Sequence, residues 1–455
     1  PQQAIMLSLF DGTIGLQEIT RQVAFLFNLD LAAAAEQLES LLALPVSSER
    51  KIVHLLKEGT HNGAVREYNP ADFVVPSDAI DMNDVRCVLP HTALVLPTMR
   101  CATDCIYCYA DRKGMQGRKE FDLKLFQKIL KDIAGCGIET VDFSGGDFFC
   151  RPDALELVAE TFRQGLYPVI PTKMPLTAEK ARRLAAMGLQ TIQVSIDAVT
   201  PEVIDQMMQR SGYGRNILQT IDTLGDAGIR IRTNTVLTPI NMHDVPALIL
   251  HLIQRPFVMK SNITWYARSI YRHDDGLFVR RDTVKEVEST IYDIIAANPE
   301  RHITYSGPNA DYYAGSPEEK ADNYRQRAFC GANRGGFVVL PDGRVTICEE
   351  LYFHPDFIIG DLNHKTLQEI WHSPKALALA TPDQKKVPDG SCRNCDIYRQ
   401  CHDHLGRCYR DAIKAYGYDR AHWPDPRCPK APRGNPFVAD ECLHNSSDFK
   451  TFNGG

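Results

Sequence analysis

The sequence lacks the features that mark membrane-spanning, disulfide-rich and disordered proteins. None of its 455 residues lies in an apolar stretch approaching the ~20 residues that cross a bilayer. Its 14 cysteines are too dilute for a small disulfide-stapled scaffold, and its 30 glycines and 27 prolines are ordinary numbers for a chain of this length. Hydrophobic residues make up 44% of the chain. The chain is therefore long and apolar enough for two or three domains, each with its own core.

An excess of positive charge is also missing. The formal net charge is -6 and the pI is near 6.2, so we expect neither nucleic acid nor a membrane as the main partner. The first residues show no basic region followed by an apolar core, the pattern of a signal peptide. We therefore expect a cytoplasmic protein. In a reducing cytoplasm clustered thiols usually bind metal.

Residues 1–66 are predicted to form a winged-helix-like domain. Residues 16–44 have the apolar spacing of two amphipathic helices, and residues 51–56 resemble a short strand. Winged helices often bind DNA, but residues 1–60 carry four Lys or Arg against seven Asp or Glu, which would repel phosphate. The Pro-containing polar stretch that follows predicts a linker over residues 67–90.

Residues 91–298 alternate short apolar runs with longer helical segments, which is typical of βα units around a parallel sheet. We predict six strands, at residues 92–96, 140–143, 169–171, 191–196, 229–236 and 263–266, and helices at residues 122–134, 153–163, 177–186, 213–227 and 243–253. A closed barrel needs eight such units. We therefore expect an α/β fold with a partial (β/α)6 TIM-like barrel, whose chemistry sits where the strands end.

Residues 299–455 are predicted to form a Cys-rich C-terminal domain and tail. The composition shifts toward Gly, Pro, Cys and Arg, and few long stretches show a periodic spacing of apolar residues. Seven of the eight cysteines of this region fall between Cys330 and Cys428. We expect bound metal to take the place of an ordinary hydrophobic core in this region.

Three thiols, Cys101, Cys105 and Cys108, directly follow the first predicted strand. A compact loop of this spacing can give three thiolates to one four-iron, four-sulfur cube and leave the fourth iron open to a substrate. The alternatives are three unconnected core thiols and a tetrahedral zinc site, which would need a fourth ligand. The nearest candidates for that ligand are Asp104, Asp111 and His91.

These three cysteines, with Tyr107 before the last of them, resemble the CxxxCxxC signature of radical S-adenosylmethionine enzymes. The resemblance implies that an aromatic ring at Tyr107 packs by the adenine and that the open iron chelates the methionine part of S-adenosylmethionine. It also implies an activity, in which the reduced cluster cleaves the sulfonium and the resulting 5'-deoxyadenosyl radical abstracts hydrogen from carbon. The protein would orient and shield that chemistry.

The resemblance implies further cofactor contacts at the strand ends. They are Gly145, Gly146 and Asp147 after the second strand, Ser195 and Asp197 after the fourth, Arg210 in the following loop, and Asn234 on the fifth. Asp147 stands where the family has Glu, so backbone carbonyls are expected to take more of that contact. Lys173 lies where relatives often have an Asn-Gly pair, which leaves the shape of that loop open. Outside the family, Gly-Gly-Asp is also a common turn.

A second group of cysteines resembles the SPASM extension of the same enzymes, which binds two auxiliary iron–sulfur clusters. Its members are Cys330, Cys348, Cys392, Cys395, Cys401, Cys408 and Cys428. The resemblance assigns Cys392, Cys395, Cys401 and Cys428 to one cluster and the remaining three to the other. Six residues separate Cys401 from Cys408 where relatives usually have three. With the first loop, this implies S-adenosylmethionine and three [4Fe-4S] clusters.

The cluster assigned to Cys330, Cys348 and Cys408 is one ligand short, and Cys442 or a substrate group could complete it. Cys392-x2-Cys395 by itself also fits a zinc ribbon, with His402 and His404 nearby. The other three cysteines, Cys87, Cys136 and Cys150, read as ordinary thiols. Glu349 follows Cys348, a position where SPASM enzymes that oxidise a side chain carry the acidic residue that takes the released proton. Alternatively, Glu349 is an ordinary surface charge beside Glu350 with no catalytic role.

Residues 1–13, followed by two helices, are similar to the leader-recognition elements of ribosomal-peptide maturases, which bind a peptide by adding a strand to a small sheet. With the barrel and SPASM resemblances, this predicts a maturase that abstracts hydrogen from a leader-bearing precursor peptide. The product would be a thioether, a carbon–carbon crosslink or an excised backbone segment. A reductant such as flavodoxin or ferredoxin is implied as a second partner. The alternatives are a SPASM enzyme that forms formylglycine in a folded protein, and a zinc-stabilised adaptor without catalysis.

Overall fold

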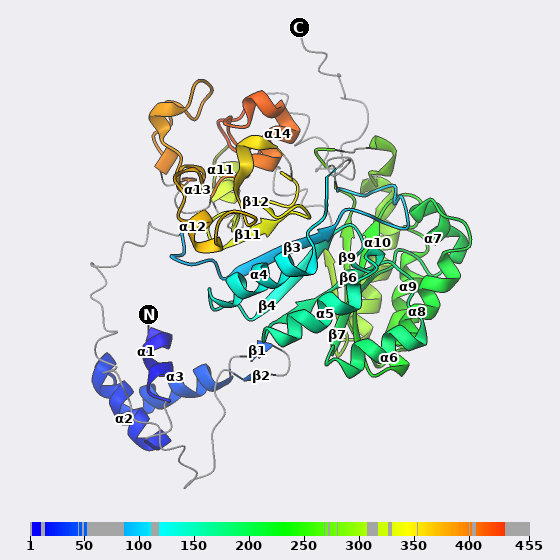
Figure 1. Ribbon diagram of the computed structural model, residues 1–455, viewed down its shortest axis with the longest axis horizontal. Helices are drawn as coiled ribbons and strands as arrows, with labels where there is room; N and C mark the ends of the chain where they lie inside the picture. Colours follow the sequence, from blue (N-terminus) through cyan, green and yellow to red (C-terminus); the bar gives the residue numbers. More distant parts are fainter. Residues whose placement is uncertain are drawn as a thin grey trace. The chain divides into compact units, whose positions relative to one another are not determined.

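The computed structural model describes residues 2–10, 14–43, 45–47, 50–51, 86–110, 118–267, 269–271, 274–279, 281–306, 317–325, 330–352, 354–399, 401–402 and 406–432 (Figure 1). The chain divides into two compact units, Pro1–Met82 and Asn83–Gly455. Among the described residues, no helix is both long and apolar enough to span a membrane. The predicted linker over residues 67–90 lies outside these ranges up to residue 85.

The described residues of the smaller unit form three helices and a short hairpin. They are α1 (Gln2–Ser8), α2 (Leu16–Phe27), α3 (Leu31–Ala43), β1 (Pro45–Ser47) and β2 (Arg50–Lys51), with β1 and β2 antiparallel. The two helices predicted in residues 16–44 are confirmed, and their buried Val23 and Leu38 pack with Leu9 of the segment that follows α1. Helix α1 was not predicted. The strand predicted at residues 51–56 falls mostly outside the described residues, so the winged helix stays a prediction.

The larger unit is built on parallel strands, as predicted. They are β3 (Thr92–Thr98), β4 (Thr140–Gly145), β5 (Tyr167–Val169), β6 (Pro171–Thr172), β7 (Thr191–Ser195), β8 (Arg230–Leu237), β9 (Val258–Trp265) and β10 (His302–Ser306). One sheet has the order β10-β9-β8-β7-β6, and the other contains β3-β4-β5. Only Ile170 separates β5 from β6, so the two sheets follow each other along the chain. Five of the six predicted strands are present, and the sixth, predicted at residues 169–171, is divided at Ile170 between β5 and β6. The α/β arrangement is the one expected of a partial barrel.

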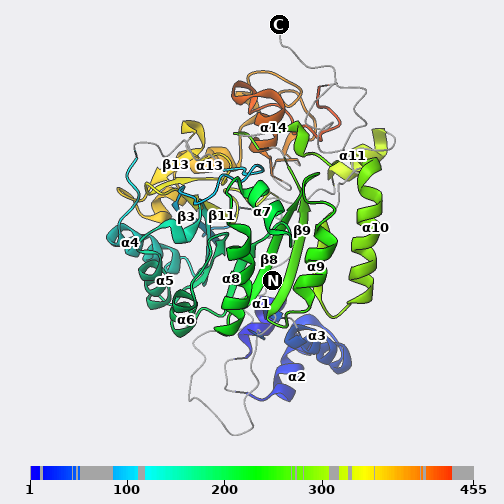
Figure 2. The ribbon, with the colours of Figure 1, turned by 90° about the vertical axis from the view of Figure 1, so that its right-hand side faces the viewer.

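Helices cover this sheet because each carries one apolar face. They are α4 (Leu123–Ala134), α5 (Ala154–Arg163), α6 (Ala178–Ala186), α7 (Pro201–Met208), α8 (Gly214–Asp226), α9 (Val245–Ile253) and α10 (Arg281–Ala297). In α4 the side chains of Phe126, Ile129 and Ile133 recur at helical spacing and are fully buried. Helix α8 packs against β8 and α9 against β9 (Figure 2). All five predicted helices are confirmed.

The C-terminal region extends the sheet that contains β3, β4 and β5. Strand β11 (Gly336–Val339) pairs in parallel with β3, and β12 (Arg344–Thr346) and β13 (Ile358–Asp361) continue antiparallel beyond it. The further helices are α11 (Pro317–Arg325), α12 (Leu367–Trp371), α13 (Pro374–Ala380) and α14 (Tyr409–Tyr416). Sheet pairing thus runs across the predicted boundary between residues 298 and 299.

The expectation that this region has no ordinary hydrophobic core was wrong. The Trp371 ring, Ile370 and Val345 are fully buried and belong to the same hydrophobic cluster as the barrel helices. The short apolar runs are too brief to show a helical period, yet they pack onto a core that β3 and α4 already provide. Burial of apolar area therefore contributes to the stability of this region.

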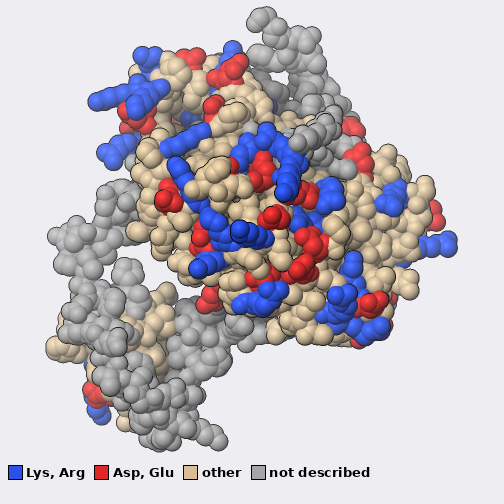
Figure 3. All heavy atoms as spheres, viewed as in Figure 1, with Lys and Arg blue, Asp and Glu red and all other residues tan. Residues whose placement is uncertain are grey.

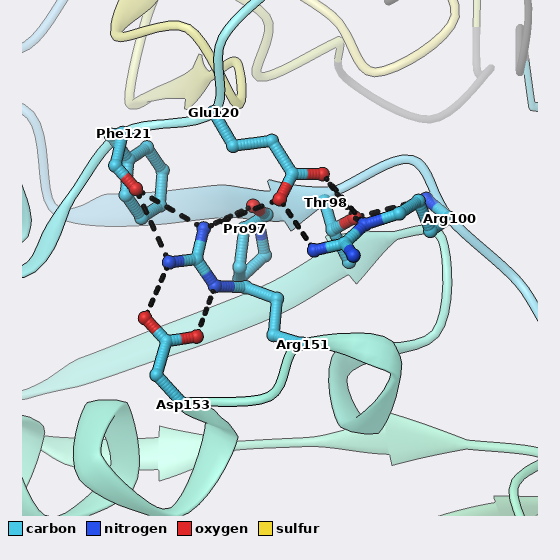
Figure 4. Close-up of polar contacts among 7 residues, drawn as sticks. All are labelled: Pro97, Thr98, Arg100, Glu120, Phe121, Arg151 and Asp153. Atoms are coloured by element: carbon cyan, nitrogen blue, oxygen red, sulfur yellow. Dashed lines mark hydrogen bonds and ion pairs between the residues drawn. The ribbon is translucent and has the colours of Figure 1, made fainter.

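A buried arginine joins three segments at the end of β3. The Arg151 guanidinium, 6% exposed, donates to the carbonyl oxygens of Pro97 (3.0 Å) and Phe121 (3.2 Å) and forms a two-pronged ion pair with Asp153 (Figure 4). Arg151 lowers the pKa of the Asp153 carboxyl by hydrogen bonding and charge. Glu120 accepts from Arg100 and lies 3.7 Å from Arg151. This network fixes β3 just before the Cys101 loop begins.

We predict that Arg151→Met lowers the free energy of unfolding of the larger unit by about 3 kcal/mol, because two carbonyls and a carboxylate lose a buried partner. Denaturant unfolding followed by circular dichroism measures this value. Arg182→Met, at an exposed position on α6, is the matched control and is expected to change stability by less than ~0.5 kcal/mol. Equal effects of the two substitutions would contradict the prediction.

Candidate functional site

A cavity of about 470 Å³ opens at the carboxyl ends of the parallel strands. This is the end of a βα barrel where loops gather side chains, and the volume suits a small organic cofactor or a peptide side chain. Predicted site residues that line it are Cys101, Cys105, Tyr107, Cys108, Gly145, Gly146, Asp147, Ser195 and Asn234. Nine predicted residues separated by up to 133 positions therefore meet around one space.

The Cys101–Cys108 loop is held in place by backbone contacts to α7. The Asp104 and Ile106 amides donate to the carbonyls of Met208 (3.1 Å) and Met207 (3.0 Å). Cys105 is buried, and its sulfur lies 3.4 Å from the Thr103 hydroxyl. The thirteen described cysteines are thiols, with no disulfide joining any two of them. All three thiols of the loop face the cavity, so the donor set suits a thiolate-bound cluster.

Gly145 and Gly146 let β4 approach the start of the cysteine loop. Gly145 has φ +97°, and a Cβ there would lie 2.7 Å from the Thr98 carbonyl oxygen. A Cβ on Gly146 would lie 2.2 Å from the Arg100 carbonyl oxygen. Without a Cβ at either glycine, the backbones come close enough for hydrogen bonds: the Gly146 amide donates to the Thr98 carbonyl oxygen and the Asp147 amide to the Arg100 carbonyl oxygen. The Gly-Gly pair is therefore required by close backbone approach.

The Asp147 carboxylate is fully engaged by the protein. It accepts from the Thr172 hydroxyl (2.9 Å), the Lys173 amide (2.7 Å) and the Phe149 amide (3.0 Å). Burial raises the pKa of Asp147, and these hydrogen bonds oppose that shift. Asp147 thus links β4 to the loop after β6. The expectation that backbone carbonyls take more of the cofactor contact stays a prediction.

Lys173 fixes the wall beside the cysteine loop. Its ammonium forms an ion pair with Asp197 (2.8 Å), donates to the Tyr107 hydroxyl and lies 4.7 Å from the Tyr107 ring centre. The Tyr107 hydroxyl in turn donates to Asp197, and burial raises the Tyr107 pKa well above its usual value. Asp197 is 0% exposed and does not itself line the cavity. The shape of the loop at Lys173, which the sequence left open, brings this lysine to the carboxylate of Asp197, a predicted site residue.

Arg210 is not directed into the cavity. Its guanidinium donates to the Ala102 carbonyl oxygen and lies 5.0 Å from the Tyr213 ring centre. It braces the cysteine loop from outside, whereas Lys173 is the cation that the barrel presents to the cavity. Lys173 directly follows β6 and Arg210 lies between α7 and α8, and the sequence alone does not show which of these loop cations faces the cavity.

Glu349 lies one layer behind the cavity wall. Its carboxylate accepts from the hydroxyls of Tyr109 (2.9 Å) and Ser144 (3.2 Å), which both line the cavity. Burial raises the pKa of Glu349. A half-buried carboxylate with a raised pKa next to a cavity can act as a general base, whereas a solvated surface charge would not show this environment. Sequence reasoning missed Tyr109 and Ser144, although both adjoin predicted motifs.

The C-terminal region adds charges that were not predicted. Glu350, Arg410 and Lys414 line the cavity, and Glu350 forms ion pairs with Arg410 (2.9 Å) and Lys414 (3.3 Å). Arg410 also pairs with the buried Asp411, and both acids hold the Arg410 pKa above its usual value. Helix α14 carries all three of Arg410, Asp411 and Lys414. In a sequence, two cations spaced i, i+4 look the same whether the helix directs them inward or toward solvent. Arg410 and Lys414 could therefore not be predicted as cavity residues.

Four of the SPASM-like thiols line a second cavity. Cys392, Cys395, Cys401 and Cys428 surround it, and the Tyr324 hydroxyl lies 3.3 Å from the Cys401 sulfur. Burial raises the pKa of Cys428 to about 12. A thiol with so high a pKa ionises when a metal binds it. In the described part of the chain no three His, Cys, Asp or Glu side chains converge as ligands of a single metal ion.

The remaining three thiols lie around the start of α14. Cys408 occupies the N-cap position of this helix. A Cβ on Gly406 would lie 2.9 Å from the Cys330 carbonyl oxygen, so the two segments pass closely. Burial raises the pKa of Cys348 to about 11 and that of Cys408 well above its usual value, while Arg410 opposes both shifts. Cys442, His404 and Asp111 lie outside the described residues.

Comparison with known proteins agrees with this geometry. A model of the radical SAM superfamily matches residues 95–252, and the SPASM model, an iron–sulfur cluster-binding domain, matches residues 330–396. The chain is 25% identical over 365 residues to a PqqA peptide cyclase of Ruegeria pomeroyi, which covers 79% of this chain and 92% of the relative. For a PqqA peptide cyclase of Gluconobacter oxydans the identity is 27%, covering 75% and 91%.

Among solved structures, Streptococcus suis SuiB bound to S-adenosylmethionine superposes with a TM-score of 0.60 at 16% identity, covering 94% of this chain and 92% of that one. SuiB bound to its precursor peptide SuiA gives a TM-score of 0.59 at 17% identity, covering 95% and 91%. These similarities establish a shared fold.

We predict that Gly146→Ala displaces the cysteine loop, because the new Cβ would meet the backbone of both Arg100 and Met99 within 2.6 Å. The expected effects are a loss of stability of about 1–3 kcal/mol and less iron bound by the anaerobically purified protein. Gly135→Ala is the control, since Gly135 is exposed with an ordinary φ of -64°. Unchanged iron content in Gly146→Ala would contradict this role of the glycine.

Proposed function

We propose that this chain, which carries a radical SAM domain and a SPASM domain, is a maturase that abstracts hydrogen from a residue of a ribosomally made precursor peptide and installs a crosslink. The observation that carries the proposal is the strand-end cavity, where three thiols of one loop face two hydroxyls bonded to the Glu349 carboxylate. A radical source and a proton acceptor would thus share one space. The PqqA peptide cyclase relatives favour crosslinking over formylglycine formation in a folded protein.

Three groups of thiols offer donor sets of the kind that hold iron–sulfur clusters. We assign Cys101, Cys105 and Cys108 to the cluster that binds S-adenosylmethionine. Cys392, Cys395, Cys401 and Cys428 would hold one auxiliary cluster, and Cys330, Cys348 and Cys408 another, for three [4Fe-4S] clusters in all. When bound, the first cluster and S-adenosylmethionine supply the radical chemistry.

The chain's own residues would orient the cofactor. Tyr107, fixed by Lys173 and Asp197, presents its ring to the cavity beside the three thiols. Ser195 and Asn234 offer polar groups from the ends of β7 and β8. The backbone of Gly145 and Gly146 lies against the loop start, so the cavity is shaped before any ligand enters.

Glu349 would hold the proton that the substrate releases when it is oxidised. Its carboxylate reaches the cavity through the hydroxyls of Ser144 and Tyr109, and its raised pKa makes it a stronger base than an exposed glutamate. The adjacent Glu350 is already neutralised by Arg410 and Lys414. Glu349 is therefore the carboxylate of the pair that is suited to accept a proton.

The partner would be a leader-bearing precursor peptide. SuiB shares this fold and has been crystallised with its precursor peptide SuiA. We propose that residues 1–66 recognise the leader, that residues 67–90 link them to the barrel of residues 91–298, and that residues 299–455 carry the auxiliary clusters. A flavodoxin or ferredoxin would act as reductant.

We predict that Cys105→Ala abolishes reductive cleavage of S-adenosylmethionine to 5'-deoxyadenosine and removes about four irons per chain, because one thiolate of the first cluster is lost. Product is quantified by liquid chromatography after dithionite reduction, and iron by chemical analysis. Cys136→Ala is the control, since Cys136 lines neither thiol cavity. Retention of 5'-deoxyadenosine formation in Cys105→Ala would refute the assignment, and stoichiometric zinc in a colourless wild-type protein would favour the adaptor alternative.

We predict that Glu349→Gln lowers formation of crosslinked peptide at least ~100-fold, the scale of a lost general base, while 5'-deoxyadenosine still forms. Mass spectrometry of the peptide, with 5'-deoxyadenosine measured in the same samples, separates the two effects. Glu286→Gln, at an exposed position on α10, should leave both products unchanged. Crosslinking at the wild-type rate in Glu349→Gln would exclude it as the base.

A further inference from the structure

A group of exposed cations lies on and beside the Cys392–Cys395 turn. The short 3-10 helix η7 (Gln384–Lys386) is bound to this turn, since the Gln384 side chain donates to the carbonyl oxygens of Cys392 (3.1 Å) and Cys395 (2.8 Å). Lys385 and Lys386 of η7 are exposed. Figure 3 shows Lys and Arg side chains gathered at the upper left, where Figure 1 places the segment after α13.

Two more cations complete this surface. Arg393 lies between the two cysteines, is exposed, and donates to the Pro388 carbonyl oxygen. The Lys430 ammonium lies 3.4 Å from the Cys395 sulfur. We call Lys385, Lys386, Arg393 and Lys430 the basic patch. It sits on the same residues that the iron–sulfur domain match covers, apart from Lys430.

The acidic residues nearby are already engaged. Asp396 forms an ion pair with Lys430, Asp389 pairs with His422 and accepts from Trp423, and the Asp383 side chain caps η7. Among the described residues, Lys385, Lys386 and Arg393 form no ion pair. In a chain with a net charge of -6, residues 385–393 carry these three cations and one acid, Asp389, whose carboxylate is bound by His422 and Trp423.

We infer that the basic patch is the docking surface for an acidic one-electron carrier protein, which binds over the thiols of Cys392 and Cys395. The inference rests on the proposed function, because it assumes that these thiols hold an iron–sulfur cluster. The carrier would give up one electron and the enzyme would gain it, with no bond made or broken. Weak electron-transfer encounters of this kind use small interfaces and long-range charge attraction.

Nucleic acid is a poorer match for the same surface. Duplex binding proteins typically neutralise about 6–10 phosphates, whereas the basic patch offers three cations without an ion pair and one that is already paired. An acidic protein surface presents fewer, discrete charges.

The test compares the full-length holoenzyme with a Lys385→Glu/Lys386→Glu double variant. The control is Arg182→Glu/Lys285→Glu, which makes the same charge change at exposed positions of α6 and α10. The probe is a purified acidic flavodoxin in its hydroquinone form. Its Kd for each protein and the rate of flavin oxidation on anaerobic mixing are measured at ~0.02 M and ~0.5 M ionic strength, where the charge interaction is long-ranged and strongly screened, respectively.

We expect the patch variant to bind about tenfold more weakly and to oxidise flavodoxin about tenfold more slowly at low ionic strength, with the difference disappearing at high ionic strength. The control should match the wild type within about twofold. Lys385→Gln/Lys386→Gln should fall between them. Dithionite-driven 5'-deoxyadenosine formation and iron content should be the same in all four proteins, which shows that fold and clusters are intact.

Equal loss in patch and control variants, or no flavodoxin binding by the wild type, would overturn the inference. So would binding of single-stranded DNA that depends on Lys385 and Lys386 as strongly as flavodoxin binding does. A wild-type protein that fails to cleave S-adenosylmethionine with dithionite would instead overturn the proposed function. The two failures are therefore distinguishable.

Discussion

The architecture of the larger unit depends on β3, which hydrogen-bonds in parallel to β4 on one side and to β11 on the other. Parallel pairing puts equivalent strand ends together, so the cysteine loop that follows β3 must meet the glycines at the end of β4. Their backbones come close enough that no Cβ fits between them. Because β11 belongs to the C-terminal region, the same strand also anchors the segment that carries Cys348 and Glu349.

A second constraint is that nearly every charge around the cavity is compensated. Burying a charge costs several kcal/mol unless a partner or hydrogen bonds offset it. Asp147 is offset by backbone amides, Asp197 by Lys173, and Glu350 by Arg410 and Lys414. The wall of the cavity is therefore electrostatically fixed before a ligand binds, which is the condition for positioning reactive species without reorganisation.

Much of the fold and of the candidate site could be predicted. Alternating apolar runs located five of the six predicted strands and five helices, and the spacing of Cys101, Cys105 and Cys108 located the strand-end cavity. The apolar pattern failed for strands whose pairing partners are distant in sequence. It could not show that β10 pairs with β9 or that β11 pairs with β3, because the sequence of one strand does not identify its neighbour in the sheet. It also misjudged the C-terminal region, whose short apolar segments pack onto a core made by other elements.

The sequence by itself determined the chemistry that the chain can offer, because thiol spacing, Gly-Gly pairs and helical periodicity are local and need no knowledge of neighbours. Only the tertiary structure decided which charged groups meet. It turned Arg210 away from the cavity and Lys173 toward it, placed Glu349 behind Tyr109 and Ser144, and brought Arg410 and Lys414 to the wall from the C-terminal region. Those choices depend on strand register and helix packing, in which contacts between remote residues outweigh the preferences of any single segment.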